Sequence, residues 1–157
     1  MRDDEKEHIT NHNHGDGISD GVETNSGTFV DENDTGTNPN LVDSDTDTMP
    51  DDYELANGLN PTSDDGAGDI DEDGATNLRE FELGTNQKSK DTDGDTLLDG
   101  VETKTGTWVS AEDTGTNPLT DDTDGDGLSD TVETNSGTFA GAANPGTNPN
   151  LADTDED

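Results

Sequence analysis

The chain has 157 residues with a formal net charge of -35, 22% hydrophobic and 3% aromatic side chains, and no cysteine. Ordering a residue costs about 1–2 kcal/mol of backbone entropy, and so few apolar side chains cannot offset this cost. No disulfide can stabilise the fold, because the chain has no cysteine. Nucleic acid is an unfavourable partner because its phosphates would be repelled, and no segment is long and apolar enough for membrane insertion.

Residues 1–11 form a polar lead-in, and residues 12–157 form an array of repeated acidic loops. Four of the loops match a twelve-residue spacing in full, with acidic or amide side chains at positions 1, 3, 5, 9 and 12. Loops 1 to 5 start at residues 12, 43, 69, 91 and 122, and a partial loop 6 starts at residue 153. Such repetition with a fixed spacing indicates a tandem repeat protein.

Loop 1 is atypical because His12 and His14 replace the carboxylates at positions 1 and 3. Histidine is a poor calcium ligand and a good ligand for transition metals, so these residues together with His8 are candidates for a zinc or nickel site. The alternative is a degenerate repeat at the end of the array, with a weak or empty site.

The spacing predicts several calcium ions, with at least one in each complete loop. A hard divalent cation takes six to eight oxygen ligands, and alternate residues of a tightly curled backbone point toward one centre. We expect the carbonyl of position 7 to add a ligand and the glutamate at position 12 to close the site with both oxygens. The predicted ligands are Asp16, Asp20 and Glu23 in loop 1; Asp43, Asp45, Asp47, Met49, Asp51 and Glu54 in loop 2; Asp69, Asp71, Asp73, Ala75, Asn77 and Glu80 in loop 3; Asp91, Asp93, Asp95, Leu97, Asp99 and Glu102 in loop 4; Asp122, Asp124, Asp126, Leu128, Asp130 and Glu133 in loop 5; and Asp153, Asp155 and Asp157 in loop 6.

Position 6 normally requires glycine, and it is Gly127 in loop 5. Loops 2 and 4 carry Thr48 and Thr96 there instead. A β-branched residue in a left-handed turn is strained by about 1–2 kcal/mol, so these two sites are expected to be weaker or differently shaped.

Two kinds of segment connect the loops. Thr-rich segments around Phe29, Trp108 and Phe139 predict short β-hairpins, each followed by a Gly-Thr-Asn-Pro turn. Residues 53–56 and 77–83 predict one or two helical turns, which Gly58 and Gly84 end. These helices are too short for an EF-hand domain.

The five aromatic residues, one for each complete loop, are expected to form a small local core in each repeat. Asp34, Asp113 and the turn asparagines have two open interpretations: a second cation in each repeat, or the ordinary preference of these residues for turns.

The run Asp-Thr-Asp-Gly-Asp-Gly-Leu-Ser-Asp at 122–130, the segment 99–103 and the turn 115–118 resemble thrombospondin type 3 repeats, most closely those without cysteine in bacterial secreted and surface proteins. The resemblance implies a mostly irregular, calcium-stabilised tandem repeat rod with short helical turns, short β-hairpins and no conventional hydrophobic core. It also implies that the acidic positions named above bind calcium. The histidines of loop 1 and the two threonines at position 6 depart from the family pattern.

We therefore expect a non-enzymatic, extracellular, calcium-binding spacer or structural module, since weak calcium loops fill only where calcium is about millimolar. The alternative is a disordered acidic calcium buffer, or an adhesion or mineral-binding polyelectrolyte, which would need acidity but no fixed spacing. Loop 6 lacks positions 9 and 12, so the acidic N-terminus of another copy could complete it in a head-to-tail filament. Equally, the chain could be a piece of a longer protein.

Overall fold

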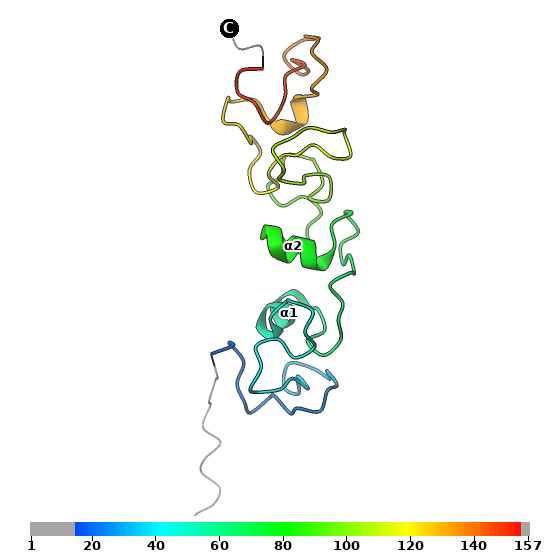
Figure 1. The fold of residues 1–157 in the computed structure, drawn as a ribbon, viewed down its shortest axis with the longest axis vertical. Helices are drawn as coiled ribbons and strands as arrows, with labels where there is room; N and C mark the ends of the chain where they lie inside the picture. The colour runs from blue at the N-terminus through cyan, green and yellow to red at the C-terminus, as the bar shows by residue number, and fades with distance from the viewer. Residues whose placement is uncertain (1–14, 155–157) are drawn as a thin grey trace, which may run out of the picture. The chain divides into compact units, whose positions relative to one another are not determined.

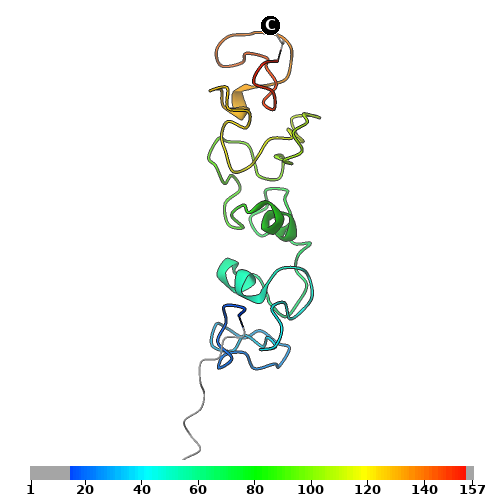
Figure 2. The same cartoon turned by 60° about the vertical axis from the view of Figure 1, so that its left-hand side comes forward.

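The structure is a computed structural model that describes residues 15–154. The chain divides into two compact units, Met1–Gly68 and Asp69–Asp157. Loops 1 and 2 belong to the first unit, and loops 3, 4 and 5 belong to the second. Most of the described chain is irregular, and the two labelled α-helices are short (Figures 1 and 2).

The first helix, α1, spans Asp51–Asn57 and contains positions 9 to 12 of loop 2. It follows the extended Pro50 and begins with acidic side chains, which interact favourably with the positive end of the helix dipole. It ends at Gly58, whose left-handed φ of 80° lets its N–H donate to the Glu54 carbonyl. The predicted helical turn before Gly58 is confirmed.

The second helix, α2, spans Asn77–Leu83 and occupies the same place in loop 3. The hydroxyl oxygen of Thr76 caps its start by accepting the Arg79 N–H at 3.2 Å, and Gly84 ends it with a φ of 83°. In loop 5 the equivalent segment is a 3-10 turn, η1, at Asp130–Val132. Positions 9 to 12 are therefore helical or nearly helical in three loops.

The Thr-rich segments reverse direction and pair through backbone hydrogen bonds without forming regular strands. In the first, the N–H groups of Asn25 and Gly27 donate to the carbonyls of Thr37 and Gly36 at 2.8 and 3.0 Å. The described residues hold only isolated β-bridges, at Asp31–Asp34, Ser110–Asp113 and Gly141–Asn144. The predicted hairpins therefore take this irregular form.

The glycine of each Gly-Thr-Asn-Pro turn sits against the opposite segment of its hairpin. A Cβ on Gly36 would overlap the backbone of Thr28, and the same clash recurs at Gly115 and Gly146. All three glycines also have positive φ. These positions require glycine for two independent reasons, space and backbone conformation.

The interior of both units is mainly polar. In the described residues, five apolar side chains and three prolines are buried, whereas the glutamates at position 12 and the turn threonines Thr37 and Thr116 are fully or almost fully buried. The prediction of no conventional hydrophobic core therefore agrees with the structure. The prediction that aromatic residues form local cores fails for Phe139, which is 74% exposed, and the other four aromatic side chains are only partly buried. Threonine hydroxyls and carboxylates occupy the space instead.

Candidate metal centres

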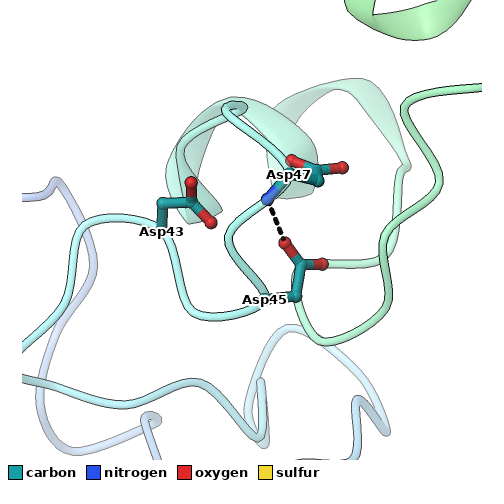
Figure 3. A group of neighbouring side chains, drawn as sticks. All are labelled: Asp43, Asp45 and Asp47. Atoms are coloured by element: carbon teal, nitrogen blue, oxygen red, sulfur yellow. Dashed lines mark hydrogen bonds between the residues drawn. The ribbon is translucent and has the colours of Figure 1, made fainter.

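Positions 1, 3 and 5 come together in four loops. In each, one carboxylate oxygen from each of the three aspartates lies within 4.8 Å of the other two. Figure 3 shows this arrangement for loop 2, where the three side chains stand on alternate residues of one turn. The four groups are Asp43, Asp45 and Asp47; Asp69, Asp71 and Asp73; Asp91, Asp93 and Asp95; and Asp122, Asp124 and Asp126.

The loop backbone holds each group in place. In loop 2 both oxygens of Asp43 accept backbone N–H groups, from Thr46 at 2.6 Å and Thr48 at 3.1 Å. Asp45 accepts the N–H of Asp47 at 3.2 Å, and Asp47 accepts that of Met49 at 2.9 Å. Loops 4 and 5 repeat all four bonds. Aspartates that fold back on their own loop keep one or more oxygens oriented toward their neighbours without help from a distant core.

This curl places left-handed backbone at positions 4 and 6 of loops 1 to 5. Position 6 has a φ of 91° at Thr48, 85° at Thr96 and 93° at Gly127. The left-handed turn expected at these positions is confirmed, and the two threonines adopt the conformation that disfavours a β-branched residue.

Position 9 closes the loop from the other side. The Asp51 carboxylate accepts both the N–H and the hydroxyl of Ser44, at 2.8 and 2.7 Å. Asp99 and Asp130 bind the threonine at position 2 of their loops in the same way. None of these residues belongs to a three-carboxylate group, and their assignment as cation ligands remains a prediction.

The glutamates at position 12 of loops 1 to 5 are all buried. Glu54, Glu80 and Glu102 have no exposed surface. Burial, followed by the charge of Asp45, raises the pKa of Glu54 to about 9, and burial raises the pKa of Glu102 to about 8. A buried carboxylate among other carboxylates must take up a proton or a cation.

Threonine hydroxyls support most of these glutamates. Thr37 donates to Glu23 at 3.2 Å, and Thr116 donates to Glu102 at 3.0 Å. The second oxygen of each glutamate is buried without a hydrogen-bond partner. The threonine of the Gly-Thr-Asn-Pro turn therefore has a role at the site that the sequence analysis missed, although its recurrence in the repeats was a usable signal.

Neighbouring loops of the second unit touch through position 5. The Gly100 N–H donates to Asp73 at 3.1 Å, and the Thr131 hydroxyl donates to the carbonyl and the carboxylate of Asp95. Gly100 and Thr131 both occupy position 10 of the following loop. A candidate ligand of one loop is therefore held by the next loop.

Several predicted residues lie outside these groups. Asp16, Asp20 and Glu23 are described, but His12 and His14 of loop 1 and the earlier His8 are not. Asp153 is exposed, while Asp155 and Asp157 fall outside the described residues. The carboxylates of Asp34 and Asp113 accept threonine hydroxyls within their hairpins and belong to no carboxylate group.

No family model, curated protein or solved structure matches this chain. The resemblance to thrombospondin type 3 repeats therefore rests on the loop residues alone. Among the described residues, no helix is long and apolar enough to cross a membrane.

Proposed function

We propose that the chain is a calcium-binding structural repeat module that works as an extracellular spacer. The observation that carries this proposal is the recurrence of one arrangement: three aspartates within 4.8 Å of one another in each of four loops, with a glutamate seven residues after the last of them. A chance excess of acidic residues would not repeat both the spacing and the backbone bonds that hold it.

The donor chemistry favours calcium over other cations. The candidate ligands are carboxylate and backbone oxygens, the described residues contain no cysteine or histidine, and the irregular loops suit the flexible geometry that calcium accepts. Magnesium demands a smaller, near-octahedral site and retains its water.

Metal binding is then the source of folding free energy. A site of extracellular affinity supplies about 4–5 kcal/mol, so several filled sites are needed to stabilise a chain with this charge. The module fills at millimolar calcium and becomes an ordered spacer. It has no catalytic role in this proposal.

Circular dichroism and amide NMR dispersion, recorded with calcium, with EDTA and with magnesium at matched ionic strength, test the proposal. We expect dispersed amide signals only with calcium, with recovery when calcium is restored. A spectrum that does not change with EDTA, or that sodium chloride restores equally well, contradicts it. Calcium binding without amide dispersion would support the disordered buffer instead.

A further inference from the structure

The first unit contains a fifth three-carboxylate group, which the loop pattern does not explain. One ligand atom each from Asp47, Glu54 and Asp65 lie within 4.8 Å of one another. Asp65 lies in the segment between α1 and loop 3, outside any twelve-residue loop. Asp47 also belongs to the loop 2 group, so the two groups share one aspartate.

Glu54 points into this group without any hydrogen-bond donor. Its side chain has no exposed surface, and both of its carboxylate oxygens are buried without a hydrogen-bond partner. The second oxygen of Asp47 is also buried without a partner. A buried carboxylate that lacks donors is strongly destabilising unless a positive charge compensates it.

No side chain of the described part of this unit can supply that charge. Residues 15–68 contain no lysine, arginine or histidine. The two groups together comprise five carboxylates, from Asp43, Asp45, Asp47, Glu54 and Asp65. One divalent cation in loop 2 neutralises fewer than half of them, and a second leaves the cluster close to neutral.

The turn after α1 differs in sequence from the other turns at the residue that follows its glycine. The other turns place a threonine between the glycine and the asparagine, and Thr37 and Thr116 donate from there to the glutamate at position 12. In the turn after α1 that residue is Leu59, which is buried and has no hydroxyl. Glu54 has therefore lost a donor and has gained a carboxylate neighbour, Asp65.

Asp65 is held in position by the same turn. Its Oδ2 accepts the Asn60 N–H at 3.0 Å, and the Asn60 side chain accepts the N–H and the hydroxyl of Thr62 at 3.2 and 3.0 Å. The turn begins where the Leu59 N–H donates to the Glu54 carbonyl at 2.8 Å. A carboxylate fixed next to another buried carboxylate is the arrangement expected of a cation site.

We propose that Asp47, Glu54 and Asp65 form a second divalent cation site, distinct from the loop 2 site and joined to it through Asp47. The site takes calcium by the same oxygen chemistry, and this assignment rests on the proposed function. Its effect is to pin the segment after α1 onto loop 2, whereas Glu23 and Glu102 of loops 1 and 4 each accept a threonine hydroxyl instead.

The test is a count of calcium ions bound per full-length chain at fixed free calcium, by equilibrium dialysis and elemental analysis, for the wild type, Asp65→Asn and Asp64→Asn. Asp64 is the exposed neighbour of Asp65, and its substitution removes the same charge without touching the group. We expect Asp65→Asn to bind one calcium ion fewer than the wild type, and Asp64→Asn to bind the same number.

The double variant Leu59→Thr with Asp65→Asn guards against unfolding, because it offers Glu54 the kind of hydroxyl donor that Glu23 and Glu102 have. It should retain the calcium-bound circular dichroism of the wild type and still bind one ion fewer. An unchanged count in Asp65→Asn overturns the second site and indicates that Glu54 holds a proton instead. A loss of more than one ion in the double variant also overturns it. A wild type that binds no calcium contradicts the proposed function itself, which is a separate result.

Discussion

Position 6 of loops 2 and 4 offers a direct measure of the backbone strain in the acidic loops. Thr48 and Thr96 have φ values of 91° and 85°, where glycine is normally needed. Both side chains are exposed, so replacing them by glycine removes little packing. We predict that Thr48→Gly and Thr96→Gly each stabilise the calcium-bound protein.

The expected gain follows from two opposing terms. A left-handed conformation costs a residue with a Cβ about 1–2 kcal/mol, and glycine removes this cost. Glycine also increases the freedom of the unfolded chain, which returns about 0.4–1 kcal/mol. The net gain is about 0.5–1 kcal/mol per site, equivalent to roughly two- to fivefold tighter calcium binding because binding and folding are coupled.

Thermal unfolding at saturating calcium and titration against a calcium-binding dye measure the two consequences. Gly127→Ala in loop 5 is the matched control, since its φ is 93° and no atom lies within 4 Å of the added Cβ. This control should weaken calcium binding through backbone conformation alone. An unchanged or lower midpoint for both threonine variants, or a neutral effect of Gly127→Ala, would refute the reasoning.

Three further predictions concern the hairpins, the contact between loops and the effect of pH. Gly115→Ala should lower the thermal unfolding midpoint far more than Gly106→Ala. Both glycines have positive φ, but only a Cβ at Gly115 would clash with backbone atoms. Equal losses for the two variants would contradict this prediction. Thr131→Val, which removes a hydroxyl bonded to loop 4, should cost about 0.5–1.5 kcal/mol in chemical denaturation at saturating calcium, and no loss would count against the contact. Burial raises the pKa of Glu54 to about 9 and of Glu102 to about 8, from 4.5. When protonated, both glutamates therefore stabilise the metal-free fold; this contribution is complete below pH about 4.5 and is lost as the pH rises toward 8–9. Acidification without calcium should then increase the order seen by circular dichroism. A loss of order on acidification would refute the assignment.

The parts of the site that the sequence predicted are those built by local geometry. Asp43, Asp45 and Asp47 converge because alternate residues of a curled turn share one side, and their own backbone N–H groups hold them there. The helical turns were predictable for the same reason, because Gly58 and Gly84 end each of them through a backbone conformation that glycine favours.

The parts that the sequence did not predict depend on contacts between separate segments. Asp65 belongs to no repeated pattern, so only the fold reveals that it lies beside Glu54. One aromatic residue per repeat predicts a local core only if the backbone closes over the ring, and it does not do so at Phe139. The first two Gly-Thr-Asn-Pro turns close instead over Thr35, Thr37, Thr114 and Thr116, which are fully or almost fully buried.

The contacts between loops would give the proposed calcium binding a route to cooperativity within the second unit. Asp95 is a candidate ligand in loop 4, and its carboxylate also accepts the hydroxyl of Thr131 in loop 5. Asp73 stands in the same relation to Gly100 in the following loop. An empty loop leaves its aspartates repelling one another and free to move, and this weakens the hydrogen bond that orients the next loop. A filled loop fixes the aspartate and so prepares its neighbour, which is the nearest-neighbour coupling expected of a repeat protein whose interior is made of charged groups rather than apolar ones.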